Sequence, residues 1–178
     1  QEAFALLQEI ERADVSEFTG DGIDASTWTQ GPVPGRFDAF GIDDETDGIF
    51  WERIEVDLPE NFAGRDLTLS LGAIDDHDTT YFNGKEVGST RGWSTPRSYP
   101  VPGATVRAGR NVIAIQIIDG AGPGGLHGAP EAFFIHPTDD PSDRVAIEGR
   151  AALTFVADVS EMPAQHLPSH LYNGMLHP

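Results

Sequence analysis

The chain has 178 residues and no cysteine, and its 11 basic and 29 acidic side chains give a formal net charge of −18. This length fits one domain with a core of its own, and the lack of cysteine excludes a disulfide framework and thiolate chemistry. The negative charge disfavours phosphate backbones and anionic membrane surfaces, so we expect no nucleic-acid and no membrane partner. A neutral partner such as a sugar, or a calcium ion, fits the charge better.

The N-terminal residues predict a short helix over 2–13, because Phe4, Leu7 and Ile10 recur at helical spacing without an intervening glycine or proline. No apolar run reaches the ~18 residues that span a bilayer, and we expect no signal peptide in this segment. From residue 19 onward, glycines and prolines separate short apolar runs. That pattern is typical of an all-β sandwich or barrel.

Alternating apolar and polar residues predict strands at 49–59 and 67–74, the second with Leu67, Leu69, Leu71 and Ala73 facing inward. The β-branched run at 111–119 predicts a central strand that is buried on both faces. Shorter runs predict further strands, at 79–82, 85–88, 131–135, 144–149 and 152–158.

The dipeptide Asn83-Gly84 lies between two of the short strands and is a strong hairpin signal. A type I′ turn needs positive φ at both central residues, and Asn and Gly tolerate that conformation best. Two other stretches, 35–48 and 119–130, predict loops, the first strongly acidic and the second rich in glycine. Long loops on a rigid framework often carry binding function.

The stretch 75–78 reads Asp-Asp-His-Asp and raises the question of an acidic site. On an extended strand Asp75 and Asp76 point to opposite faces, so only Asp76 and Asp78 could approach one substrate. Our main expectation is structural: Asp75, Asp76 and Asp78 stabilise the turn between two strands by accepting backbone hydrogen bonds. Sugar contact or calcium binding at these aspartates are the alternatives.

A second acidic run contains Asp43, Asp44 and Asp47. A solvated loop is the simplest interpretation, but hard carboxylate oxygens suit calcium, so these three residues are weak calcium candidates. We predict no other metal site. His166 and His170 have the spacing of a helical zinc pair, but Pro168 between them would break the helix.

Candidate sugar contacts are Trp93, Arg97, Tyr99 and His127. Aromatic rings can stack on sugar faces, and arginine can donate to hydroxyl or carboxylate groups. The alternatives are that Trp93 covers an edge of the sandwich and that His127 is an ordinary surface histidine. No Gly-x-Ser-x-Gly or Gly-Asp-Ser motif indicates a serine nucleophile.

Four motifs in order carry a family resemblance: GIFWERIEVDLP, LGAIDDHDTTYFNGKEVGSTRGW, YPVP and GRNVIAIQIIDGAGPGGLHG. Over residues 22–130 the chain resembles the β-domain inserted in sialate O-acetylesterases, which are carbohydrate esterases of the SGNH-hydrolase type. That insert is similar to a galactose-binding-like jelly roll, akin to the sugar-binding domain of family 2 glycoside hydrolases. The resemblance therefore implies an all-β jelly-roll sandwich with a short N-terminal helix.

The end of the chain, LPSHLYNGMLHP, is similar to the segment that re-enters the catalytic domain in this family. The family's Gly-Gln-Ser-Asn nucleophile block and closing Asp-x-x-His pair are absent from this sequence. We thus expect a lead-in with the helix over 1–18, a jelly-roll domain over 19–160, and a re-entry tail over 161–178. Catalytic residues are expected outside this chain.

The resemblance implies a non-catalytic accessory domain of a sialate O-acetylesterase, supporting the catalytic domain of the same parent chain or substrate access. The alternative is a free-standing carbohydrate-binding module. No cofactor is expected beyond a possible structural calcium, and the parent is expected to be periplasmic or extracellular. The family usually has an aromatic residue where Glu52 stands, on the inward face of its strand. Because a buried carboxylate needs a partner, we expect Arg53, a later arginine or an open strand edge beside it.

Overall fold

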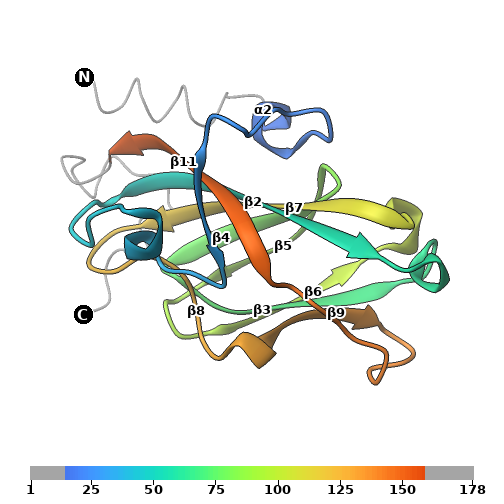
Figure 1. Cartoon of the computed structure of the whole chain (residues 1–178). Helices are drawn as coiled ribbons and strands as arrows, with labels where there is room; N and C mark the ends of the chain where they lie inside the picture. Colours follow the sequence, from blue (N-terminus) through green and yellow to red (C-terminus); the bar gives the residue numbers. More distant parts are fainter. Residues whose placement is uncertain (1–14, 159–178) are drawn as a thin grey trace.

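The computed structural model describes residues 15–158, which form two antiparallel β-sheets packed face to face (Figure 1). The first sheet has the spatial order β1 (Thr29–Val33), β11 (Gly149–Asp158), β2 (Gly48–Leu58), β7 (Gly109–Asp119), β4 (His77–Phe82) and β5 (Lys85–Arg91). The second has the order β10 (Val145–Ala146), β9 (Phe133–Pro137), β3 (Leu67–Asp75) and β6 (Pro96–Val101), with β8 (Gly125–His127) also paired to β3. The predicted all-β jelly-roll sandwich is confirmed.

Short helices join the strands, namely α2 (Ser16–Thr19) and the 3₁₀ turns η1 (Phe37–Phe40), η2 (Glu60–Phe62), η3 (Gly103–Thr105) and η4 (Pro130–Ala132). The helix predicted at 2–13 and the tail at 161–178, with His166 and His170, lie outside the described residues. Within residues 15–158, no helix has the length and apolar character that crossing a bilayer requires.

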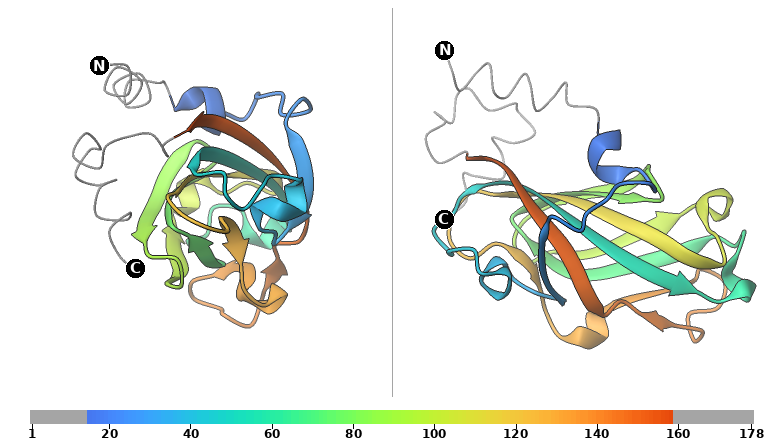
Figure 2. Two further views of the ribbon diagram at one scale, coloured as in Figure 1. Left: turned by 90° about the vertical axis from the view of Figure 1, so that its left-hand side faces the viewer. Right: turned by 45° about the horizontal axis from the view of Figure 1, so that its top comes forward.

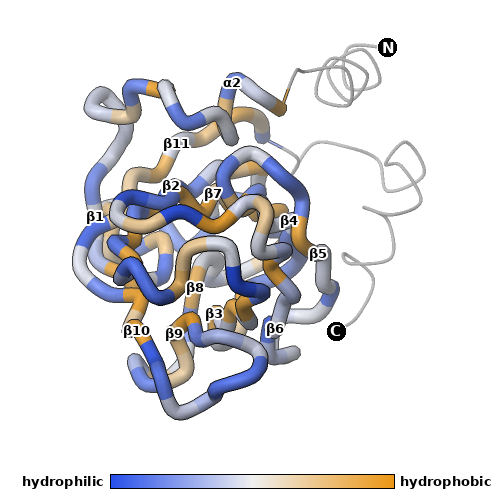
Figure 3. Tube along the Cα trace, turned by 90° about the vertical axis from the view of Figure 1, so that its right-hand side faces the viewer, coloured by the Kyte–Doolittle hydropathy of each residue, from blue (hydrophilic) through white to orange (hydrophobic). Residues whose placement is uncertain are grey.

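The core lies between the two sheets and follows from the alternation along the strands. On β2, Phe50, Ile54 and Val56 point inward and are buried. The opposite face of the same strand carries Trp51, whose ring stacks on Phe18 of α2 at 4.9 Å between centroids. Figure 2 shows the sandwich in two further views, and in Figure 3 the hydrophobic stretches lie mainly in the strands and the hydrophilic ones mainly in the connections.

The predicted central strand and hairpin are both confirmed. β7 pairs with β2 on one side and with β4 on the other. Asn83 and Gly84 have φ of 47° and 83°, as the turn requires. The Asn83 side chain also donates to Asn111 Oδ1 at 2.8 Å and accepts from the backbone N–H of Val112 at 2.8 Å. The hairpin is thereby joined to the start of β7.

The structure corrects several sequence-based boundaries. β1 and β6 were not predicted, and the segment at 144–149 contains only the two-residue strand β10. The expected loop at 119–130 contains β8, which pairs with β3, and the expected loop at 35–48 contains η1. On β3 the register shifts between Ser70 and Ala73, so Ile74 is fully buried and Ala73 is not. Gly72, with φ of 58°, lies in that shift and makes it possible.

Glu52 is a further correction, because neither an arginine nor an open edge accompanies it. The side chain is fully buried, in a strand with a neighbour on each side, and neither carboxylate oxygen has a hydrogen-bond partner. Arg53 points to the opposite face, where it donates to the carbonyls of Phe18 and Gly20. Burial raises the pKa of Glu52 to about 8, so the carboxyl is protonated at neutral pH.

Candidate functional site

Strand ends bring acidic residues together at one end of the sandwich. Asp119 is the last residue of β7, and it pairs with Gly48 at the start of β2. Gly48 also pairs with Asp158 at the end of β11, and Asp47 directly precedes Gly48. The 35–48 and 119–128 segments meet at this same end, to the left in Figure 1, where Phe37 N donates to Gly124 O at 3.0 Å.

The centre of this acidic end is formed by Asp75, Asp76 and Asp119, and one carboxylate oxygen from each lies within 4.8 Å of the others. Asp75 is the last residue of β3, and Asp76 lies between β3 and β4. The expectation that Asp75 and Asp76 point to opposite faces was therefore wrong, because the extended backbone it assumed ends at Asp75.

The three carboxylates differ in what holds them. Arg36 Nη1 lies 3.4 Å from Asp75 Oδ2, and Asp76 Oδ2 accepts the backbone N–H of Gly120 at 3.0 Å. Asp119 is fully buried, and its carboxylate oxygens have no well-formed hydrogen bond, with only the backbone amide of Ala121 close enough to act on them. Asp119, the most buried of the three carboxylates and the one with the weakest polar contacts, thus lies beside two other acidic side chains.

Burial and mutual repulsion disfavour the charged forms of these carboxyls. Burial raises the pKa of Asp119 to about 8, and the charges of Asp76, Asp75 and Asp47 add to the effect, while the backbone amide of Ala121 opposes it slightly. Burial also raises the pKa of Asp76 to about 6, where the Gly120 N–H opposes the shift and Asp75 adds to it. Without a cation, Asp119 therefore retains its proton near neutral pH.

A glycine fixes the position of Asp119 from the loop side. A Cβ atom at Gly124 would lie 2.6 Å from Asp119 Oδ2 and 2.4 Å from the ring of Phe37. Only glycine lets the loop backbone pack this closely against both side chains.

Next to the acidic cluster, Trp93 and His127 form an aromatic surface. Trp93 is the most exposed large hydrophobic side chain among residues 15–158, at 59%. Its ring stacks on the His127 imidazole at 6.4 Å between centroids, and His127 Nε2 lies 2.6 Å from the Trp93 carbonyl oxygen. The preceding Gly92 donates its N–H to the Asp76 carbonyl at 2.9 Å, so the aromatic surface directly adjoins the acidic cluster.

The other two predicted sugar contacts, Arg97 and Tyr99, lie inside the sandwich. Arg97 is 1% exposed, and its Nε donates to Asp78 Oδ1 at 2.7 Å. Tyr99 is 5% exposed and donates to Asp78 Oδ2 at 2.8 Å, where the Thr80 hydroxyl also donates. This interior position removes Arg97 and Tyr99 from the candidate sugar surface. It makes Asp78 the centre of a buried network that joins β4 of one sheet to β6 of the other.

The second acidic run divides between two environments. Asp43 and Asp44 are exposed, and Asp43 accepts the backbone N–H of Glu45 within its own loop. Burial raises the pKa of Asp47, and the charges of Asp158, Glu45 and Asp76 add to that shift, so Asp47 belongs electrostatically to the acidic end. Calcium binding by Asp43, Asp44 and Asp47 stays a prediction.

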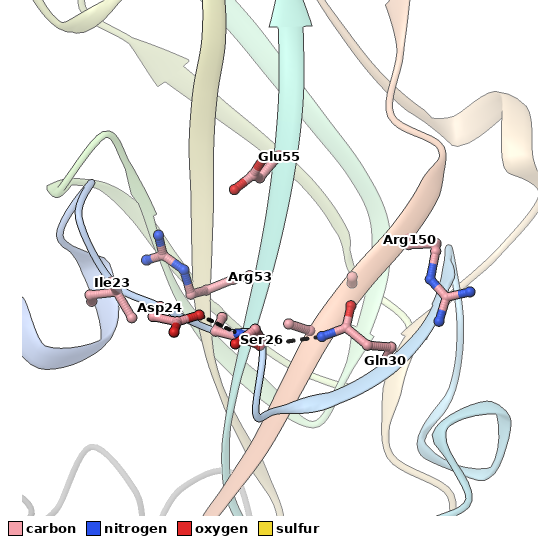
Figure 4. Close-up of a pocket in the computed structure, with 10 residues that line it drawn as sticks. Ile23, Asp24, Ser26, Gln30, Arg53, Glu55 and Arg150 are labelled. Carbon is pink, nitrogen blue, oxygen red and sulfur yellow. Dashed lines mark hydrogen bonds between the residues drawn. The ribbon is translucent and has the colours of Figure 1, made fainter.

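A separate pocket of about 560 Å³ lies on the outer face of the first sheet (Figure 4). Arg53, Glu55 and Arg150 line it, together with the turn around Ser26. Two of these charged groups are engaged elsewhere: Arg53 bonds to two backbone carbonyls, and Glu55 pairs with Arg110. The pocket is therefore a weaker candidate than the acidic and aromatic end.

Sequence reasoning missed Asp119, which the structure places at the centre of the site. The available signal was its position, because a carboxylate ended the most apolar strand and a glycine-rich loop followed. The serine hydroxyls of Ser70, Ser89 and Ser142 donate to Ala132 O, Asp78 O and Asp140 Oδ1 rather than to a histidine.

Neither a protein-family model nor a curated protein matches the chain. Solved structures do. β-Glucuronidase 2 of Bacteroides uniformis, covalently bound to cyclophellitol-6-carboxylate aziridine, is 25% identical with a TM-score of 0.52 and covers 62% of this chain. The β-glucuronidase of Ruminococcus gnavus, in complex with C6-substituted uronic isofagomine, is 20% identical with a TM-score of 0.50 and covers 84%.

The chain spans only 15% and 27% of the length of these two enzymes. The likeness supports an all-β sandwich domain of a kind found in carbohydrate-active enzymes. It gives no support to an esterase as the parent.

Proposed function

We propose that this chain is a non-catalytic β-sandwich domain of a larger carbohydrate-active enzyme, and that its Trp93–His127 surface contacts saccharide. The observation that carries the proposal is the exposure of Trp93 beside His127, in a molecule that otherwise buries most of its large aromatic rings. An exposed indole held by a stacked neighbour is costly to leave in water and suits the apolar face of a sugar ring.

The sandwich likeness to segments of β-glucuronidases supports the carbohydrate-active parent. The motif resemblance at residues 22–130 favours a sialate O-acetylesterase as that parent, with this domain shaping substrate access to a catalytic site elsewhere. The coding sequence on either side separates the two parents, because an SGNH esterase would supply a Gly-Gln-Ser-Asn block and a glucuronidase would not.

A free-standing carbohydrate-binding module is the second candidate, favoured by the same exposed indole. Such a module grips its glycan without help, whereas an accessory domain needs the catalytic domain to complete the site. Affinity tighter than ~1 mM for the isolated chain would favour the module.

Trp93→Ala is expected to weaken saccharide binding at least about tenfold, because it removes the stacking surface. Calorimetric titration with N-acetylneuraminic acid, glucuronic acid and methyl β-galactoside measures the effect. Thermal stability should change little, since Trp93 is mostly exposed. Trp28→Ala is the control at a second tryptophan, one that contacts Phe18 rather than the Trp93–His127 surface, and should bind as the wild type does. Equal affinity of Trp93→Ala and wild type for every sugar bound would contradict the proposal.

A further inference from the structure

The acidic cluster contains a buried side chain whose partner is missing. Asp119 is fully buried, and apart from the weak influence of the Ala121 backbone amide its carboxylate oxygens have no hydrogen-bond partner, which is costly in a folded protein unless something neutralises or binds them. Its oxygen is directed at the oxygens of Asp75 and Asp76, within 4.8 Å. Three carboxylates at this separation repel one another in the absence of a cation or shared protons.

We propose that Asp75, Asp76 and Asp119 bind a divalent cation, and that the cation is Ca²⁺. This inference does not depend on the proposed saccharide contact. Asp119 supplies the buried ligand from the end of β7, while Asp75 and Asp76 supply ligands from the end of β3 and the residue after it.

The donor set decides in favour of calcium. All three donors are hard carboxylate oxygens, whereas zinc sites favour histidine nitrogen and cysteine sulfur. Two oxygens on opposite sides of a Ca²⁺ ion lie about 4.8 Å apart, given ligand distances of about 2.4 Å. The observed separations fit within that limit. Mg²⁺ holds its ligands at about 2.1 Å and requires nearly ideal octahedral geometry, so it fits this set less well.

The surroundings favour the ion further. Asp47 and Asp158 add negative charge at the same end of the sheet, since β2 and β11 bring them next to Asp119 through Gly48. Arg36 pairs with Asp75 at 3.4 Å and offsets one of these negative charges, which leaves the cluster and its acidic neighbours in excess. The Gly120 N–H holds Asp76 Oδ2, and the close packing at Gly124 holds Asp119 Oδ2, so the ligands are positioned before the ion arrives.

A bound ion would connect the two sheets. Asp119 belongs to the first sheet and Asp75 to the second, and the loop that carries His127 begins immediately after Asp119. We therefore expect Ca²⁺ to stabilise this end of the sandwich, including the loop that carries His127 of the aromatic surface.

The test is a thermal melt of the full 178-residue chain after chelation with EGTA, repeated with CaCl₂. We expect the melting temperature to rise by about 5–10 °C at Ca²⁺ about one hundred times its dissociation constant. Asp119→Asn should lose this shift, whatever its own melting temperature in EGTA. Asp44→Asn, an exposed acid of the 43–47 run, is the matched control and should keep the full shift.

Terbium luminescence gives an independent measurement if Asp119→Asn fails to fold. Tb³⁺ replaces Ca²⁺ and is sensitised by a nearby indole, here Trp93. The wild type should show Tb³⁺ emission that CaCl₂ displaces, and Asp76→Asn should weaken Tb³⁺ binding at least about tenfold. Absence of both a melting shift and displaceable emission overturns the proposal. A Ca²⁺ shift that survives in Asp119→Asn, or that is lost in Asp44→Asn, also overturns it by placing the ion elsewhere.

Discussion

Glu52→Leu is expected to stabilise the protein by about 3–5 kcal/mol at pH 8. At pH 8 the folded wild type must either ionise a fully buried carboxyl without a partner or bind a proton that the unfolded chain, with its ordinary carboxyl pKa of 4.5, does not bind. Leucine is similar in size and meets the cross-strand neighbours Ile115 and Leu153 with apolar surface. Urea unfolding in EGTA, at several pH values, measures the effect.

The pH dependence of folding stability follows from the direction in which the pKa of Glu52 shifts on folding. A carboxyl whose pKa is raised on folding leaves the native state holding more protons than the unfolded state, so stability falls as pH rises. For Glu52 the full stability is present below about pH 4.5 and is lost by about pH 8. Asp119 and Asp76 act in the same direction, with pKa values of about 8 and 6. Between these pH values, Glu52→Leu should therefore reduce the fall in the free energy of unfolding by about 1.4 kcal/mol per pH unit. The remaining pH dependence comes from the other two carboxyls.

Glu55→Gln is the matched control, because Glu55 lies on the outer face of the same strand in an exposed pair with Arg110. It should change the free energy of unfolding by no more than about 1 kcal/mol. Destabilisation by Glu52→Leu at pH 8 would mean that Glu52 has a stabilising partner in solution, contrary to its position in the core.

Arg97→Met is expected to destabilise the protein by about 3–5 kcal/mol, since it leaves Asp78 charged and buried without its counter-ion. Both side chains of this pair are 0% exposed, and their Nε–Oδ1 distance is 2.7 Å. The guanidinium also donates to the carbonyls of Gly92 and Thr95. The variant therefore also loses two hydrogen bonds to the segment that carries Trp93. Chemical denaturation measures the change.

The double variant Asp78→Asn/Arg97→Met distinguishes a paired charge from simple loss of packing. Its destabilisation should be at least about 1–2 kcal/mol smaller than the sum of the two single effects, because removing both charges leaves neither unpaired. The exposed pair Arg65–Asp139 provides the comparison, and Arg65→Met should cost no more than about 1 kcal/mol. Strict additivity at Asp78 and Arg97 would show that their charges do not stabilise each other.

Much of the fold could be predicted from the sequence because local chemistry decides it. Alternation placed Ile54 and Val56 inward on β2, and the β-branched run at 111–119 became the central strand β7. Asn83-Gly84 formed the predicted hairpin because few other residues accept its backbone angles.

Long-range register explains most of what could not be predicted. The shift at Gly72 moved burial from Ala73 to Ile74, and strict alternation has no signal for such a bulge. The strand β8 exists because β3 offers it an edge, although its sequence, rich in glycine, reads as loop. Both features depend on pairing partners that are distant in the chain.

The same distinction between local and long-range features applies to the candidate site. Trp93 and His127 were predicted and lie together at the surface, although their contact with sugar is a proposal. Arg97 was a candidate sugar contact because arginine can donate to hydroxyl and carboxylate groups, but in the structure it donates to the buried carboxylate of Asp78. Asp119 was missed because its meeting with Asp75 and Asp76 depends on two sheets packing together.

Saccharide contact at Trp93 can be observed at the side chain itself by an NMR titration of the full chain. The three tryptophans, Trp28, Trp51 and Trp93, each give an indole N–H signal. On addition of saccharide, we expect the Trp93 signal to move in a saturable way, while the signals of Trp28 and Trp51 stay in place. Movement of the Trp28 signal alone, or saturation without any change at Trp93, would contradict saccharide contact at this surface.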